Sequence, residues 1–295
     1  MNDRGAFERN QYIEHERRRA IGVALDALTL TRALHDSLGA AGEEIVQKNR
    51  FDETALRIDV ESEQAIIDAL RASGLPVKVF SEEHGTVDLS EHPEYTAIID
   101  GLDGTKTYRE QRGTGRYGTM LGLYEGGTPR YADYLFGGVA EHGLGRLIFA
   151  TRGGGAFIRH KEQDTPARTS GVQTIDGRTS FGVDEYFKFN RELYLPVLGH
   201  QRQIRNFSAE SRYVDVATGQ ADLALECSRK GNLEIASSYG IIREAGGVIV
   251  DGNGQDIGPQ RYETFGQDAQ VPIITAATPE LAAQMVELLR QHHRG

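Results

Sequence analysis

The chain has 295 residues, of which 39% are apolar and 26% are charged, a balance typical of a soluble globular protein with one large or two modest domains. Its 33 basic and 43 acidic residues give a formal net charge of −10, which excludes a general nucleic-acid binder because such a protein needs a basic surface. No apolar run approaches the roughly 18 residues that span a bilayer, so no membrane partner is expected. The polar N-terminus and the single cysteine, Cys227, predict a cytoplasmic protein without a secretory signal or an internal disulfide.

The negative charge is concentrated in one segment of the chain. Residues 43–103 hold fifteen acidic and five basic residues, and this surplus of 15 − 5 = 10 equals the whole imbalance. Two interpretations remain open, a solvated acidic face or a cluster of carboxylates that collects cations.

In the first half of the chain, helices precede a group of strands. Apolar residues spaced by three or four predict one long helix over 12–47 and a second helix over 59–72. Short apolar segments separated by glycine turns then predict an antiparallel sheet. The expected strands are 77–80, 95–99, 119–124, 130–136 and 147–150.

In the second half, strands alternate with helices, which is typical of an α/β arrangement. The polar stretch 160–178 is the best candidate for a boundary. The predicted organisation is therefore an α+β half, residues 1–160, followed by an α/β half, residues 161–295. The expected helices are 208–218, 233–245 and 279–293, and the expected strands are 221–226, 248–251 and 271–276.

The most informative stretch is the loop 100–105, of sequence DGLDGT, which directly follows an apolar strand. Two buried carboxylates, Asp100 and Asp103, would repel each other and would be costly to desolvate unless cations neutralised them. Oxygen ligands without a nearby Cys or His suit a hard cation such as Mg²⁺. A sharp turn at Gly104 and Thr105 would expose backbone amides to an anion if a helix begins there. The alternative is an ordinary turn, since Asp and Gly are favoured turn residues.

Other acidic positions are candidates for the same chemistry. Glu82 follows an expected strand, and Asp59 begins an expected helix. Glu226 ends a strand and Glu234 begins the next helix. Each of them alone is equally well explained as surface charge or as a favourable charge in the first turn of a helix. They indicate a function only in combination.

Together these elements resemble the inositol monophosphatase superfamily of metal-dependent, lithium-sensitive phosphatases, which includes fructose-1,6-bisphosphatases and 3′-phosphoadenosine-phosphate phosphatases. The loop DGLDGT is similar to the family signature DP[IL]DGT, and SEEHG at 81–85 is similar to its upstream GEE or SEE element. Lys48 and Asp59 match the spacing of a family lysine and a helix-borne aspartate. The segment 208–222 resembles the family's second-domain helix and turn, and LEIA followed by EAGG within 233–247 resembles WDxA followed by EAGG.

The resemblance implies a layered α-β-α-β-α sandwich of the sugar-phosphatase type. It also implies a Mg²⁺-dependent phosphoric monoester hydrolase that uses two or three ions. The implied metal ligands are Asp59, Glu82, Asp100, the carbonyl group of Leu102, Asp103 and Glu234.

The resemblance assigns further roles at the same site. Asp59 and Thr105 would orient the attacking water, with Glu82 beside them in the catalytic group. The amides of Gly104 and Thr105 would hold phosphate oxygens. The implied contacts to the alcohol part of the substrate are Ser208, Ala209 and Glu226, and the further candidate site residues are Lys48 and Lys106.

The sequence departs from the family pattern at three positions. Gly101 replaces the proline of the loop, and Leu233 replaces a tryptophan. Glu234 replaces an aspartate, so that an extra methylene must be absorbed by a backbone shift or by a different metal geometry. The connection between Glu226 and Glu234 is also one residue longer than in many inositol phosphatases.

A small phosphorylated polyol or sugar is the expected substrate and partner. A lysine at position 106 is similar to adenosine-bisphosphate phosphatases, so a 3′(2′),5′-bisphosphate nucleotidase is an alternative, as is a fructose-1,6-bisphosphatase. A catalytically weakened relative that only binds a phosphorylated metabolite is the alternative from another class, because of Glu234. The resemblance also implies a homodimer, although no segment of the sequence specifies its interface.

Two more groups of residues bear on the substrate. Three arginines after the loop could meet a second phosphate or form a solvated basic surface. An aromatic group could stack a nucleotide base or belong to the core. The arginines are Arg109, Arg112 and Arg116, and the aromatic residues are Tyr186, Phe187 and Phe189.

Overall fold

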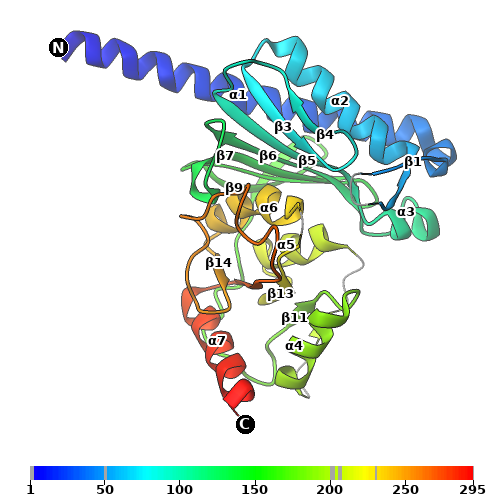
Figure 1. The fold of residues 1–295 in the computed structure, drawn as a ribbon, viewed down its shortest axis with the longest axis vertical. Helices are drawn as coiled ribbons and strands as arrows, with labels where there is room; N and C mark the ends of the chain where they lie inside the picture. Colours follow the sequence, from blue (N-terminus) through cyan, green and yellow to red (C-terminus); the bar gives the residue numbers. More distant parts are fainter. Residues whose placement is uncertain (1–2, 50–51, 200–202, 205–207, 230, 295) are drawn as a thin grey trace.

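A computed structural model describes residues 3–49, 52–199, 203–204, 208–229 and 231–294 (Figure 1). Within these residues, two large sheets are each covered by helices. The helices are α1 (Asp3–Leu38), α2 (Arg57–Ser73), α3 (Thr105–Gln111), α4 (Lys188–Leu198), α5 (Ala209–Ala217), α6 (Leu233–Glu244) and α7 (Pro279–Arg294).

The first large sheet has eight strands in the order β10-β9-β8-β7-β6-β5-β3-β4. Its described neighbours run antiparallel except for β3 and β5, which are parallel. The strands are β3 (Val77–Ser81), β4 (Gly85–Asp88), β5 (Tyr95–Asp103), β6 (Gly118–Glu125), β7 (Tyr134–Glu141), β8 (Arg146–Thr151), β9 (Gly155–His160) and β10 (Gln163–Pro166).

The second large sheet has five strands in the order β12-β11-β13-β15-β14 and mixes parallel with antiparallel pairs. Its strands are β11 (Phe181–Val183), β12 (Gln203–Ile204), β13 (Leu223–Cys227), β14 (Val248–Asp251) and β15 (Pro272–Ala276). A small hairpin of β1 (Ile45–Lys48) and β2 (Thr54–Leu56) stands apart from both sheets.

Figure 1 shows five layers, with α1 and α2 on one face of the first sheet and α5 and α6 between the two sheets. Helices α4 and α7 cover the far face of the second sheet. The predicted α-β-α-β-α sandwich is therefore confirmed. No helix of the described ranges is long and apolar enough to cross a membrane.

The chain passes from the first sheet to the second between Pro166 and Phe181, inside or next to the polar stretch 160–178. The two halves nevertheless share a core, because α6 of the second half packs on β6 and β7 of the first. The division into residues 1–160 and 161–295 remains a proposal.

The helix predicted over 12–47 begins earlier than expected, at Asp3, and also ends earlier, at Leu38. Gly39 has a φ of +47°, which ends the α-helix, and a 3-10 turn over Gly39–Glu43 leads into β1. The Tyr108 hydroxyl donates to the carbonyl oxygen of Gly39 at 2.6 Å. A side chain 69 residues away thus helps to set the end of this helix.

The strand predicted over 130–136 is also corrected, because β7 begins only at Tyr134. Residues Tyr131–Asp133 form a 3-10 turn, in which the Asp133 carboxylate accepts a hydrogen bond from the Arg130 amide at 2.8 Å. The strands β1, β2, β4, β9, β10, β11 and β12 and the helix α4 were not predicted from the sequence. The other predicted helices and strands agree with the structure within a few residues.

Two glycines allow α6 to lie directly on the first sheet. Gly122 of β6 and Gly137 of β7 are cross-strand neighbours. A Cβ atom at Gly137 would lie 2.7 Å from the carbonyl oxygen of Ser237, and one at Gly122 would lie 3.2 Å from that of Ala236. The close approach places the first turn of α6, which carries Glu234, beside β5.

We expect Gly137→Ala to lower the free energy of unfolding by about 1–3 kcal/mol, because the new methyl group forces α6 away from the sheet. Urea denaturation followed by circular dichroism measures this loss. Gly177→Ala is the matched control, since a Cβ there meets no atom within 4 Å. Equal stability of the two variants would contradict the packing argument.

Candidate metal centre and active site

Asp100 and Asp103 lie near the C-terminal end of β5, the strand predicted before the loop. In a regular strand, residues three apart point to opposite faces. Here the pairing with β6 is irregular, because Asp100 pairs with Met120 while Asp103 pairs with Gly118. Three steps on β5 thus match two steps on β6, which is the signature of a β-bulge. The bulge lets both carboxylates turn toward the same side.

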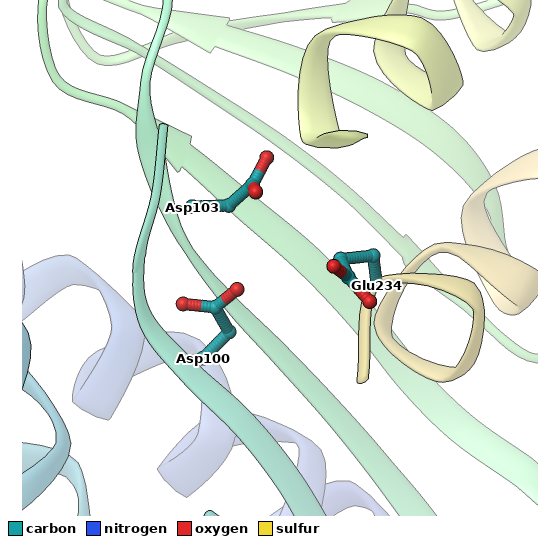
Figure 2. A group of neighbouring side chains, drawn as sticks. All are labelled: Asp100, Asp103 and Glu234. Atoms are coloured by element: carbon teal, nitrogen blue, oxygen red, sulfur yellow. The ribbon is translucent and has the colours of Figure 1, made fainter. Parts of the chain in front are cut away.

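Glu234 completes a group of three carboxylates. Figure 2 shows Asp100 and Asp103 projecting from β5 toward Glu234 in the first turn of α6. One carboxylate oxygen from each residue lies within 4.8 Å of the other two, so the group could hold a metal ion. Residues more than 130 positions apart in the sequence therefore meet at one point.

The electrostatics of this group favour a bound cation. Burial raises the pKa of Asp100 well above its ordinary value, and the charges of Glu82 and Asp103 raise it further. Burial also raises the pKa of Asp103, against the lowering effect of a hydrogen bond from the Glu210 amide at 2.7 Å. A cation would relieve this repulsion and favour the ionised carboxylates.

Glu82 and Asp59 lie beside the three carboxylates but are not members of the group whose oxygens lie within 4.8 Å. Glu82 follows β3, is only partly buried, and accepts a hydrogen bond from the Asn49 side chain at 3.2 Å. Asp59 is buried in the first turn of α2 and accepts a hydrogen bond from the Leu56 amide at 2.6 Å. Burial raises the pKa of both carboxyl groups well above their ordinary values.

Glu63 is a site residue that the sequence analysis missed. It lies one turn after Asp59 on the same face of α2, is fully buried, and holds the turn that carries Glu82. Its spacing of four from Asp59 was the available signal. Its carboxylate accepts hydrogen bonds from the Ser81 hydroxyl, from the Glu82 and Glu83 amides at 2.9 Å each, and from Nδ1 of His84 at 3.0 Å.

The glycine that replaces the loop proline has a steric reason. A Cβ atom at Gly101 would overlap the backbone carbonyl of Asp59 and approach Cγ of Glu63 to 2.9 Å. The carbonyl oxygen of Gly101 accepts a hydrogen bond from the Thr119 hydroxyl at 2.8 Å. Helix α2 therefore packs against the bare backbone of the loop, which leaves no space for any side chain at this position.

Thr105 connects the loop to α2. Its hydroxyl lies 3.5 Å from Oδ1 of Asp59 and 3.3 Å from the carbonyl oxygen of Leu102. Gly104, with a φ of +92°, turns the chain into α3, which begins at Thr105. A Cβ atom at Gly104 would lie 3.0 Å from Cβ of Ser208, so the loop contacts the start of α5.

The predicted substrate contacts lie at the start of α5 and the end of β13. Ser208 precedes α5, and its hydroxyl donates to the Arg116 carbonyl oxygen at 3.3 Å. Ala209 is the first residue of α5, and its side chain is outside the described part of the structure. Both carboxylate oxygens of Glu226 already accept hydrogen bonds. The donors are Nη2 of Arg212 at 3.0 Å and the Tyr213 hydroxyl.

Arg212 is a buried cation that the sequence analysis did not single out. Its guanidinium lies between Glu226 and Asp184, whose Oδ2 is 3.2 Å from Nη2. These carboxylates raise its pKa against the effect of burial, which would lower it. The triad holds Glu226 in place.

The remaining basic candidates lie away from the three carboxylates or are paired. Lys48 is exposed on β1 and forms an ion pair with Asp52 at 2.6 Å. Lys106 is 84% exposed on α3, and Arg109 is also exposed. Arg112 pairs with Glu43, and Arg116 pairs with the buried carboxylates of Glu141 and Asp215.

The aromatic residues predicted as a group do form one. The rings of Phe187 and Phe189 stack with centroids 5.4 Å apart, and Tyr186 packs edge-on against Phe187 at 5.0 Å. Tyr186 is 84% exposed. The guanidinium of Arg229 lies 5.2 Å from the centre of the Phe187 ring and forms an ion pair with Glu234, so the group lies next to the carboxylates.

Comparison with known proteins gives a consistent result. The model of the inositol monophosphatase family matches residues 14–294. The chain is 28% identical over 280 residues to a fructose-1,6-bisphosphatase/inositol-1-monophosphatase from Methanothermobacter thermautotrophicus, with 91% of this chain and 95% of that protein covered. It is 24% identical over 210 residues to the 3′(2′),5′-bisphosphate nucleotidase CysQ from Aggregatibacter actinomycetemcomitans, with 70% and 75% covered.

Among solved structures, that of the extragenic suppressor protein SuhB from Bartonella henselae superposes with a TM-score of 0.73. The superposition covers 92% of this chain and 98% of that chain at 19% sequence identity. This likeness supports the layered fold.

We expect Glu63→Ala to lower the free energy of unfolding by about 3 kcal/mol, because one buried and three partly buried donors lose their common acceptor. Thermal or urea denaturation measures the loss. Glu61→Ala, two residues earlier on α2, is the control, since its half-exposed pair with Arg57 at 3.5 Å contributes at most about 1 kcal/mol. Similar losses in both variants would argue against a special role of Glu63.

Mg²⁺ should stabilise the protein more as the pH rises. Burial raises the pKa values of Asp59, Glu82 and Asp100, and it raises that of Glu83 to about 7. A carboxyl group with a raised pKa stabilises the metal-free fold at low pH, and this contribution is lost as the pH rises through the raised value. A bound cation favours the ionised forms and offsets the loss.

The test compares Tm with EDTA and with millimolar Mg²⁺ between about pH 5 and about pH 8. The gap between the two curves should widen toward higher pH. A constant gap over this range would contradict the expectation.

Proposed function

Since this chain belongs to the inositol monophosphatase family, we propose that it is a Mg²⁺-dependent phosphomonoesterase that hydrolyses a small phosphorylated polyol or sugar. One observation carries the proposal: carboxylate oxygens of Asp100, Asp103 and Glu234 lie within 4.8 Å of one another, although the aspartates and Glu234 come from different halves of the chain. Such an arrangement of two buried carboxylates and one partly buried one is costly unless cations neutralise it.

We propose that the site binds two or three magnesium ions, and the three converging carboxylates support this because they offer only oxygen ligands, which Mg²⁺ prefers. The proposed ligands are Glu82, Asp100, Asp103, Glu234 and the carbonyl group of Leu102, with Asp59 helping to hold a weaker ion. Bound Mg²⁺ would lower the pKa of a water molecule and stabilise the negative charge that develops on the leaving oxygen.

The protein's own groups position the reactants. Asp59 and Thr105, whose side-chain oxygens lie 3.5 Å apart, would orient the attacking water from one side, with Glu82 beside them. The amides of Gly104 and Thr105 would donate to oxygens of the phosphate. Phosphoryl transfer depends mainly on such positioning and on charge neutralisation, so no covalent intermediate with the protein is needed.

The leaving alcohol would lie toward the second half of the chain. Ser208 and Ala209 at the start of α5 and Glu226 at the end of β13 are the proposed contacts. Because Arg212 and the Tyr213 hydroxyl already bind the Glu226 carboxylate, we propose that they hold it as a fixed acceptor for substrate hydroxyl groups. Lys48, which pairs with Asp52, and the exposed Lys106 remain further candidate contacts.

A nucleotide bearing a 3′-phosphate is the second candidate substrate. The exposed ring of Tyr186, which packs against Phe187, favours this substrate. Arg229 lies over the Phe187 ring and pairs with Glu234, so the aromatic group borders the carboxylates. An aromatic base could stack there, at a gain of about 1–3 kcal/mol.

We further propose that the protein acts in the cytoplasm as a homodimer.

The deciding experiment measures phosphate release with Mg²⁺ from inositol-1-phosphate, fructose-1,6-bisphosphate and 3′-phosphoadenosine-5′-phosphate. We expect Asp103→Asn to reduce kcat roughly 100-fold or more, because the neutral amide keeps the shape of the side chain but loses its charge. Asp88→Asn, an exposed acid on β4, should leave the rate unchanged.

If the wild type releases phosphate fastest from 3′-phosphoadenosine-5′-phosphate and Tyr186→Ala loses this preference, the second candidate substrate is the correct one. Tight binding of these compounds without phosphate release would instead favour a catalytically weakened relative that binds a phosphorylated metabolite. Normal turnover by Asp103→Asn would overturn the proposed site.

A further inference from the structure

Arg229 lies in the connection between β13 and α6, five residues before Glu234. Its guanidinium forms an ion pair with the Glu234 carboxylate. The same guanidinium lies 5.2 Å from the centre of the Phe187 ring, within the range of a cation–π contact. Arg229 is therefore held between an aromatic ring and one of the three converging carboxylates.

The charge of Arg229 reaches beyond this one pair. It lowers the pKa of Glu82 and that of Asp103, against the burial that raises both. The Arg229 side chain remains 34% exposed, whereas that of Glu234 is only 9% exposed. The Arg229 side chain thus borders solvent, whereas the Glu234 carboxylate is enclosed by the protein.

A metal ion and Arg229 would make competing demands on Glu234. The carboxylate lies within 4.8 Å of Asp100 and Asp103, where the proposed ion would bind. Two cations close to one carboxylate repel each other, most strongly where water is partly excluded. The longer side chain of Glu234, compared with aspartate, also has the reach to contact either partner.

We propose that Arg229 is a tethered counter-ion of Glu234, which competes with the metal ion for this carboxylate and leaves it when the metal binds. The inference rests on the proposed function insofar as the three carboxylates bind a cation. It adds that the affinity of this position is set by a residue that is not itself a ligand. Arg229 would act as a positioning residue that lowers the affinity of the site, so that a higher metal concentration is needed to fill it.

The test measures metal binding directly, without substrate. Free Mn²⁺ gives an electron paramagnetic resonance signal that disappears on binding, so a titration reports affinity. We expect Arg229→Gln to tighten Mn²⁺ binding about tenfold, which corresponds to about 1.4 kcal/mol. Arg229→Lys should stay close to the wild type, because it keeps the positive charge.

A double-mutant cycle ties the effect to the pair. In a Glu234→Gln background the Arg229→Gln substitution should change Mn²⁺ affinity less than about threefold, because only the weaker action of its charge on Glu82 and Asp103 remains. Arg159→Gln is the matched control, because Arg159 pairs with the exposed Asp164 at 2.7 Å away from the site. Thermal melts of every variant establish that each is folded.

The outcomes separate this inference from the proposed function. Unchanged or weaker Mn²⁺ binding by Arg229→Gln, while the wild type binds, would overturn the role of Arg229 alone. A tenfold gain that persists in the Glu234→Gln background would also overturn it. Absence of Mn²⁺ binding in both proteins would overturn the metal site itself, and with it the proposed function. The expected gain in a protein that releases no phosphate would support the counter-ion while contradicting the phosphatase.

Discussion

The repulsion between carboxylates gathered in a poorly hydrated place is the constraint on which the rest of this structure depends. Carboxylate oxygens of Asp100, Asp103 and Glu234 lie within 4.8 Å of one another, and burial raises the pKa values of the two aspartates. Without a cation, part of this charge must be suppressed by protonation or offset by neighbouring donors. The Glu210 amide and the guanidinium of Arg229 provide such offsets. The acidic surplus of residues 43–103 is therefore only partly a solvated surface.

The layered fold brings these carboxylates together through features of the backbone, a β-bulge and glycines at close helix–sheet contacts, and not by side-chain packing alone. The bulge in β5 turns two aspartates three residues apart toward one side, and bare glycines at 101 and 137 allow α2 and α6 to approach the sheet backbone closely. Glu63 then binds the turn that carries Glu82. A methyl group at either glycine would displace an entire helix, so the geometry of the site is built into the contacts between layers.

Much of the fold followed from local patterns. Helices α2, α6 and α7 and strands β3, β5, β6, β8 and β14 lie close to their expected positions. The periodicity of α2 and α7 matches the face that each buries, whereas α6, β5 and β6 are mostly apolar segments buried almost throughout. The end of α1 did not follow, since it depends on Gly39 and on a hydroxyl from Tyr108. The polar strand β10 and the short strand β11 were missed because neither carries a long apolar alternation.

By itself, the sequence determined which carboxylates are available, their position at the ends of strands and starts of helices, and the family resemblance that makes phosphate chemistry the leading expectation. Tertiary structure alone decided which of them meet. It joined Glu234 to Asp100 and Asp103, gave Glu63 and Arg212 their buried partners, and set Arg229 against Glu234. The physical reason is that such contacts join residues distant in the chain, or depend on local backbone geometry such as a bulge, and periodicity reports only which face of an element is buried.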